Sequence, residues 1–108
     1  MKPETVDEVM FGCVLSAGLG QNVARQVAIK AGIPQEVPAY TVSMVCGSGM
    51  KSVIEGARAI LCGDADIIVA GGTENMSAVP YSVPAAAGAP YEPEHPVDTM
   101  IIDGCGMR

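Results

Sequence analysis

One cysteine in this sequence lies where a chain would place a reacting sulfur atom. Residues 42–53 read VSMVCGSGMKSV, so Cys46 separates an apolar, β-prone run from a Gly-Ser-Gly turn and a helical pattern. The thiolate is the nucleophilic form of cysteine, and the partial positive charge at a helix N-terminus favours that anion. The first N–H groups of a helix have no partner within it, so they can donate to an oxyanion. This placement predicts a nucleophile that attacks an acyl or thioester carbonyl.

The residues around Cys46 leave a second interpretation open. Gly47 and Gly49 have no side chains, so a bulky substrate can approach the backbone closely. The strand-turn-helix placement is analogous to the nucleophile elbow of hydrolases, although the G-x-S-x-G pattern itself is absent. Most free cysteines, however, are small buried hydrophobic residues, and His95 in the Pro-rich segment is no obvious base for Cys46. Catalysis by Cys46 and simple packing at a tight turn are both compatible with these residues alone.

The elements that would position Cys46 alternate between strands and helices. Apolar and β-branched stretches predict strands over residues 8–15, 39–45 and 64–72. Between the first two strands, a helix is expected to begin after Asn22 as its N-cap and to end at Gly32. The order βαβαβ implies an α/β fold with a mostly parallel sheet and right-handed connections. Sites in such sheets form at the carboxyl ends of strands, and Cys46 follows one of them.

The helix after Cys46 has the clearest periodic pattern. Its apolar residues recur at helical spacing and form one face: Met50, Val53, Ile54, Ala57, Ile60 and Leu61. Lys51, Glu55 and Arg58 lie on the other face, where helix-spaced ion pairs can form, and Gly63 is expected to end the helix. In the helix before it, the apolar residues at helical spacing are Val23, Val27 and Ala31.

Composition excludes several classes of function. The chain has 108 residues, of which 49% are hydrophobic and 17% charged, as expected for one domain with a buried core. The net charge is -6 and no basic cluster exists, which argues against nucleic acid and anionic membranes as partners. No apolar run approaches the ~20 residues of a membrane helix, and the acidic N-terminus lacks an apolar signal region. We therefore expect a cytoplasmic protein. The irregular spacing of Cys13, Cys46, Cys62 and Cys105 argues against a metal site.

Three sequence blocks together resemble a known family. AGLGQNVARQVAIKAGIP, VSMVCGSGMKSV and GDADIIVAGGTENMS, in this order and spacing, are similar to the N-terminal part of thiolases, in particular of acetyl-CoA C-acetyltransferases. The resemblance runs from Lys2 to about Gly104. It implies a partial thiolase-type layered fold that lacks the family's first strand, thought to be central in the sheet, and the whole C-terminal half. Residues 1–76 would be the incomplete N-terminal α/β core and 77–108 the start of the irregular loop domain.

The same resemblance implies a ping-pong acyl transfer. Cys46 would carry the acyl group as a thioester, and its own N–H would contribute to the oxyanion hole. Two acetyl-CoA molecules would then give acetoacetyl-CoA and CoA, or CoA would cleave a 3-ketoacyl-CoA in the reverse direction. Asn22, Arg25 and Gly47 are candidates for supporting positions around Cys46. CoA thioesters would be substrates, no cofactor or metal is implied, and the parent protein would be a homo-oligomer.

The resemblance also implies groups that this chain lacks, and this leaves alternatives. The two histidines and the second cysteine of the family's site would follow Arg108, and Cys105, in CGM, is rejected as that second cysteine because it comes too early in the chain. We therefore expect negligible turnover from the chain alone. One alternative is a non-catalytic interaction module, or half of a split enzyme, that pairs through strand edges. Another is a decarboxylating condensing enzyme with an A-C-S-S/A motif, but VCGSG with TENMS favours a thiolase.

Overall fold

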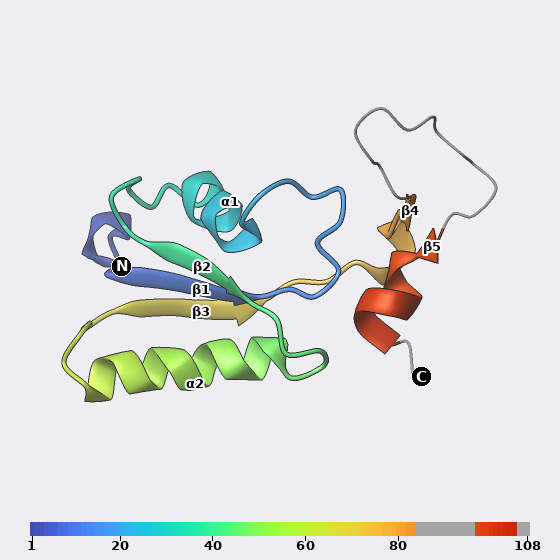
Figure 1. Ribbon diagram of the computed structural model, residues 1–108. Coiled ribbons are helices and arrows are strands. Elements are labelled where there is room, and N and C mark those ends of the chain that lie inside the picture. Colours follow the sequence, from blue (N-terminus) through green and yellow to red (C-terminus); the bar gives the residue numbers. More distant parts are fainter. Residues whose placement is uncertain (84–96, 106–108) are drawn as a thin grey trace, which may run out of the picture.

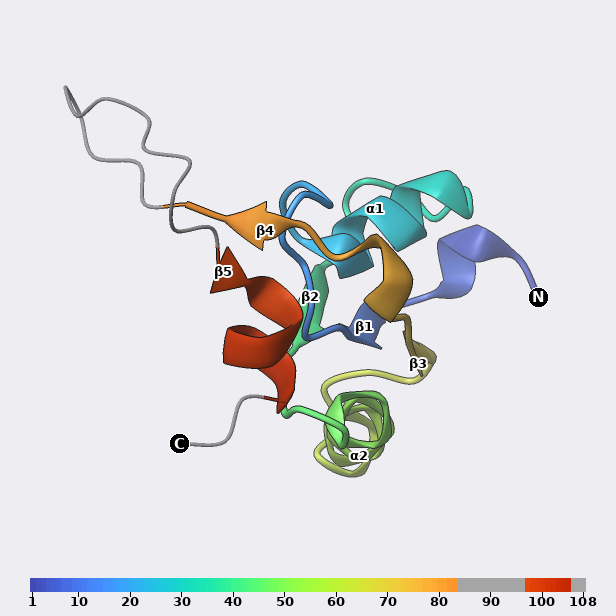
Figure 2. The same ribbon diagram turned by 90° about the vertical axis from the view of Figure 1, so that its right-hand side faces the viewer.

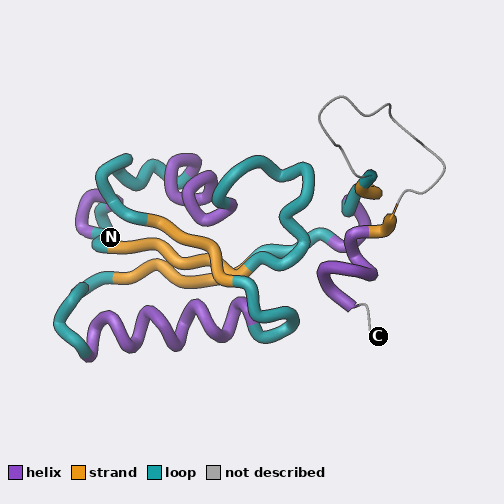
Figure 3. The backbone as a smooth tube through the Cα atoms, viewed as in Figure 1, coloured by secondary structure: helices purple, strands orange, loops and turns teal. Residues whose placement is uncertain are grey.

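A computed structural model describes residues 1–83 and 97–105 of the chain. Its larger part is a three-stranded parallel sheet between two helices (Figure 1). In chain order the elements are β1 (Glu8–Gly12), α1 (Val23–Lys30), β2 (Ala39–Val42), α2 (Ser48–Leu61) and β3 (Ile68–Gly72). The backbone view in Figure 3 shows α1 on one face of the sheet and α2 on the opposite face. The predicted βαβαβ order and parallel sheet are confirmed.

β1 is the central strand of the sheet, whose order is β2-β1-β3. Val9 is in register with Ala39 on one side and with Val69 on the other. Within the described sheet, β1 takes the central position and pairs on both sides. That the family's first strand is central in the complete thiolase sheet stays a prediction. β2 and β3 are the edges of this sheet among the described residues. Their carboxyl ends lie together with that of β1, as a parallel sheet requires.

The α1 face of the sheet holds the main apolar core. Its buried members are Val6, Val9, Ala28, Ile33 and Val37. α1 starts as expected, because the Asn22 side chain accepts a hydrogen bond of 3.1 Å from the Arg25 N–H. It ends before Gly32, which has the left-handed φ of 82°. The buried residues of α1 are Val23, Ala24 and Ala28, so the contact face differs from the predicted spacing, and Ala31 is exposed.

α2 contacts the sheet through small residues and not through its apolar face. Its buried residues are Ser48, Ser52 and Gly56. A Cβ on Gly56 would lie 2.9 Å from Cγ2 of Ile68, so the helix and β3 approach closely because this residue is glycine. The predicted apolar face exists but points away from the sheet, and Met50 and Leu61 are 68% and 86% exposed. The predicted ion pairs form on a third face, with Glu55 Oε1 3.0 Å from Lys51 Nζ and 2.8 Å from Arg58 Nη1.

The chain beyond β3 forms a small separate group of elements. β4 (Tyr81–Ser82) pairs antiparallel with β5 (Val97–Asp98), and a π-helical turn, Met100–Cys105, follows. Figure 2 shows this group beside the carboxyl ends of the central strands. The buried Thr99 hydroxyl donates to the carbonyl of Pro80 at 2.7 Å. Most of the predicted irregular insertion, including His95, lies outside the described residues. No helix in residues 1–83 and 97–105 is long and apolar enough to cross a membrane.

Candidate active site

Cys46 lies in the turn between β2 and α2, as the sequence predicts. β2 ends at Val42 and α2 begins at Ser48 with Gly47 as its N-cap. The strand is shorter than the predicted 39–45 because Val45 has a φ of 47°, which an extended strand does not permit. Cys46 is exposed, whereas Cys13 is buried. The packing interpretation of Cys46 is therefore wrong for the described chain, since its side chain is not part of the core.

The turn before Cys46 is held in a strained conformation by one side chain. A left-handed φ at a β-branched residue such as Val45 costs about 1–3 kcal/mol and persists only where neighbouring contacts enforce it. The Ser48 hydroxyl accepts from the Met44 N–H at 2.7 Å and donates to the Val45 carbonyl at 2.7 Å. Ser48 is 4% exposed, so this bridge is protected from water. The buried hydroxyl thereby fixes the two residues that precede Cys46.

Among the described residues, the backbone around Cys46 presents unpaired N–H donors, one of which belongs to Cys46 itself. The Gly47 N–H donates to the Met44 carbonyl at 3.0 Å, and the Ser48 N–H donates to the Val45 carbonyl at 3.2 Å. Among the described residues, by contrast, the Cys46 N–H has no hydrogen-bond acceptor. Cys46 also stands directly before the N-cap of a 14-residue helix, where the helix dipole favours an anion. A free N–H and a helix N-terminus at one thiol are the elements of an oxyanion site.

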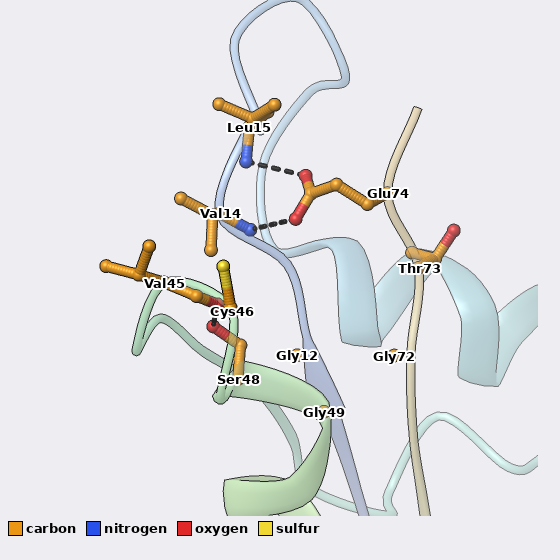
Figure 4. A pocket seen from close by; sticks show the side chains of 10 residues that line it. All are labelled: Gly12, Val14, Leu15, Val45, Cys46, Ser48, Gly49, Gly72, Thr73 and Glu74. Atoms are coloured by element: carbon orange, nitrogen blue, oxygen red, sulfur yellow. Dashed lines mark hydrogen bonds between the residues drawn. The ribbon is translucent and has the colours of Figure 1, made fainter. Parts of the chain in front are cut away.

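Cys46 opens into a cavity of about 380 Å³ at the carboxyl ends of the strands (Figure 4). Its lining residues come from β1, the Cys46 turn, α2 and β3: Gly12, Val14, Leu15, Val45, Cys46, Ser48, Gly49, Gly72, Thr73 and Glu74. The lining is mostly apolar, and in Figure 4 the Cys46 sulfur lies on the side of Val14. A small acyl group attached to that sulfur would therefore have apolar neighbours.

Glycines allow α2 to reach the strand ends that form this cavity. A Cβ on Gly12 would overlap the backbone of Ser48 and Gly49. A Cβ on Gly72 would lie 3.2 Å from Cα of Gly49, which is also a tight contact. The first turn of α2 thus lies directly against the ends of β1 and β3. Gly49 takes part in this close packing. The substrate access that the sequence suggests for Gly47 and Gly49 stays a prediction.

Glu74 is a site residue that the sequence reasoning missed. Its carboxylate accepts hydrogen bonds from the backbone N–H groups of Val14 at 3.0 Å and Leu15 at 2.7 Å (Figure 4). The buried Cys13 thiol also donates to it, with a sulfur-to-oxygen distance of 3.7 Å. Burial, and secondly the Glu74 charge, raise the pKa of Cys13, so this thiol stays protonated. The one available signal was the position of Glu74 in TENMS, directly after the carboxyl end of a strand.

The other predicted site residues lie apart from the cavity. Asn22 caps α1 and donates from its side chain to the Ala39 carbonyl, while Arg25 donates to the Gln35 carbonyl. Neither residue lines the cavity, and a supporting role for them stays a prediction. Gly47 lies in the Cys46 turn, where a Cβ would come 2.6 Å from Cε of Met44. Within residues 1–83 and 97–105, no three His, Cys, Asp or Glu side chains group to hold a metal ion.

Comparison with known proteins decides the family. The family model for the thiolase N-terminal domain matches residues 1–107. This chain belongs to the thiolase family. An acetyl-CoA acetyltransferase from Cupriavidus necator is 57% identical over 105 residues, which are 96% of this chain and 27% of that protein. One from Pseudomonas aeruginosa is 59% identical over 92% of this chain and 25% of its own length.

Solved thiolase structures have the same fold. A thiolase from Ascaris suum, crystallised in complex with coenzyme A, superimposes with a TM-score of 0.88 at 42% identity, over 96% of this chain and 27% of its own. An acetyl-CoA acetyltransferase from Bacillus anthracis gives a TM-score of 0.83 at 34% identity, over 94% and 26%. The predicted thiolase-type α/β fold is thus confirmed, and the chain spans about a quarter of the length of the relatives it matches.

Proposed function

We propose that this thiolase chain carries the nucleophile of an acetyl-CoA C-acetyltransferase, Cys46, which accepts the acyl group in the first half-reaction. The observation that supports this most directly is the exposed thiol at the N-terminus of α2, which opens into an apolar cavity. The relatives are named acetyl-CoA acetyltransferases, and one thiolase was crystallised with coenzyme A. Both facts favour a CoA thioester as the substrate.

In the proposed first half-reaction, Cys46 Sγ attacks the carbonyl carbon of acetyl-CoA. A new sulfur–carbon bond forms, the bond between that carbon and the CoA sulfur breaks, and CoA leaves as its thiol with the proton that Cys46 gives up. The Cys46 N–H, which has no acceptor among the described residues, donates to the developing oxyanion. In the second half-reaction, the acetyl group passes to a second acetyl-CoA and gives acetoacetyl-CoA. In the reverse direction, thiolysis, CoA cleaves a 3-ketoacyl-CoA.

The second half-reaction needs a base that removes a proton from the attacking acetyl-CoA. The cavity lining holds one carboxylate, Glu74, and this is already bound to two backbone N–H groups. The described residues thus provide the nucleophile and an N–H donor, while a full cycle also requires proton transfer. We therefore propose that this chain is acetylated once and does not turn over. The proposed setting is cytoplasmic, without metal or tightly bound cofactor, and the whole enzyme is proposed to be a homo-oligomer.

Intact-mass spectrometry after incubation with acetyl-CoA tests this proposal. The native chain is expected to gain one acetyl group, and Cys46→Ala is expected to gain none. Cys62→Ala is the matched control, because Cys62 is also exposed but lies at the C-terminal end of the same helix. Acetylation that persists in Cys46→Ala, or an unmodified native chain with intact circular dichroism, would contradict it. The second result would favour the alternative of an interaction module that pairs through the edges of β2 and β3.

A further inference from the structure

Two carboxylates bridge β1 and β3 at opposite ends of the pair. Asp7, just before β1, accepts from the N–H groups of Asp66 at 2.8 Å and Ile67 at 2.9 Å, just before β3. Glu74, just after β3, accepts from the N–H groups of Val14 at 3.0 Å and Leu15 at 2.7 Å, beyond the end of β1. Each carboxylate thus clamps two backbone N–H groups of the neighbouring segment, Asp7 with one oxygen, Oδ2, and Glu74 with one oxygen for each N–H. Only the Glu74 clamp lies at the cavity that Cys46 faces.

The Glu74 clamp holds a wall of that cavity. The regular ladder of β1 ends close by, with Thr73 N–H donating to the Gly12 carbonyl and Cys13 N–H donating to the Val42 carbonyl. After that point, the N–H groups of Val14 and Leu15 bind the Glu74 carboxylate. In Figure 4, Val14 lies next to the Cys46 sulfur and Leu15 lies beyond Val14, while the Glu74 carboxylate reaches both residues from the segment after β3 and does not lie between Val14 and the sulfur. The carboxylate is thus placed to fix these two residues without contacting the reacting atoms.

We propose that Glu74 is a positioning residue for acyl transfer at Cys46, because its carboxylate fixes the Val14–Leu15 wall against which the acyl group lies. This inference rests on the proposed function of Cys46. A misplacement of about 1 Å at a reacting centre can cost about a hundredfold in rate. Loss of one of the two hydrogen bonds therefore slows acylation more than it slows a reaction that needs only access to the thiol.

The distinguishing experiment compares two reactions at the same sulfur. p-Nitrophenyl acetate acetylates Cys46: a sulfur–acyl bond forms, the ester bond breaks, nitrophenolate leaves and the thiol proton passes to the buffer. Iodoacetamide alkylates the same thiol without an acyl group. The ratio of the two rate constants, corrected with Cys46→Ala, cancels changes in thiol access and ionisation. Neither reagent contains CoA, so a failure of the chain to react with acetyl-CoA does not affect this test.

Three variants of the full chain make the comparison. Glu74→Gln keeps the size of the side chain but replaces one acceptor oxygen with an amide NH₂ group, which cannot accept. Asp7→Asn removes the carboxylate charge from the clamp at the other end of the strands, where the one asparagine oxygen can still accept from both N–H groups, so it controls for loss of a clamp charge away from the cavity. Glu74→Asp keeps both acceptor oxygens on a shorter side chain, so it decides the question if Glu74→Gln fails to fold by circular dichroism.

The proposal expects a specific loss at Glu74. The acetylation-to-alkylation ratio should fall about tenfold in Glu74→Gln and by a smaller factor in Glu74→Asp. It should stay within about twofold of the native ratio in Asp7→Asn, even where that variant melts at a lower temperature. A native ratio in both Glu74 variants, or an equal fall in Asp7→Asn, overturns the proposal and leaves both clamps as structural links between strands.

Discussion

The Ser48 hydroxyl donates a 2.7 Å hydrogen bond to the carbonyl of Val45, the left-handed residue directly before Cys46. The same oxygen accepts from the Met44 N–H. Ser48 is also the first residue of α2, so one side chain ties the helix start to the strained turn. The conformation that exposes the Cys46 thiol therefore depends on a residue that is itself buried.

Replacement of Ser48 by Ala should reduce both stability and reactivity of Cys46. The change leaves the Met44 N–H and one lone pair of the Val45 carbonyl without the hydroxyl, at a cost of about 1–3 kcal/mol in free energy of unfolding. With the turn released, acetylation of Cys46 should slow about tenfold or more. Urea unfolding and intact-mass kinetics measure the two effects.

Ser52→Ala is the control for that experiment. Ser52 lies one turn later on the same face of α2, and its buried hydroxyl can donate its one hydrogen to the carbonyl of Gly49 at 2.7 Å or to that of Gly71 at 2.8 Å. We expect a loss of stability of similar size, about 1–2 kcal/mol, without the loss of Cys46 acetylation. Equal acetylation rates in the two variants would show that Ser48 supports the fold alone.

Ser52 and its neighbour Val53 should respond to substitution in the reverse of the usual hydrophobic order. Ser52 is 0% exposed and Val53 is 52% exposed. Ser52→Val places a larger apolar side chain against β3 and removes a buried hydroxyl, so it should destabilise by about 2–4 kcal/mol. Val53→Ser should change the free energy of unfolding by less than about 0.5 kcal/mol. Urea unfolding of both variants tests which face of α2 is buried, and a large loss in Val53→Ser would contradict the described packing.

These residues also show how far the sequence predicts the fold and the site. Local signals found the order of elements, the Asn22 cap and the Gly32 and Gly63 stops, because caps and left-handed glycines act within a few residues. Periodicity predicts which residues of α2 form an apolar face, but not which face contacts the sheet. In the structure, the face of Ser48, Ser52 and Gly56 packs on the strands, because small side chains allow a closer approach. Glu74 was missed because its main partners are backbone N–H groups, which any residue type except proline supplies.

Substitution at Gly12 should be far more costly than at Gly32. Gly32 has a left-handed φ of 82° but open space around it, so Gly32→Ala meets only the backbone penalty of about 1–2 kcal/mol. At Gly12, a new Cβ would overlap the backbone of Ser48 and Gly49, which cannot move without displacing the start of α2. We expect Gly12→Ala to cost about 3 kcal/mol or more and to abolish acetylation of Cys46. Chemical denaturation measures the first effect, and similar costs for both variants would show that α2 can shift.

The Asp7 clamp should make the stability of the chain depend on acid pH. Hydrogen bonds from the Ile67 N–H and then the Asp66 N–H hold the pKa of Asp7 below its usual range. An unfolded Asp titrates at about pH 4, so unfolding takes up a proton in the window between the lower folded pKa and that value. The stabilisation from Asp7 is thus fully present above about pH 4 and is lost as the pH falls through the folded pKa.

Urea unfolding of the native chain and of Asp7→Asn, from neutral pH downward, measures this contribution. The native chain should be more stable than the variant at neutral pH, because the asparagine carries no charge that the two N–H groups can stabilise. The difference should stay constant down to about pH 4 and shrink at lower pH, since Asp7 then becomes protonated and neutral in both the folded and the unfolded chain. A difference that is constant through the acid range would mean that the hydrogen bonds to Asp7 do not depend on its charge.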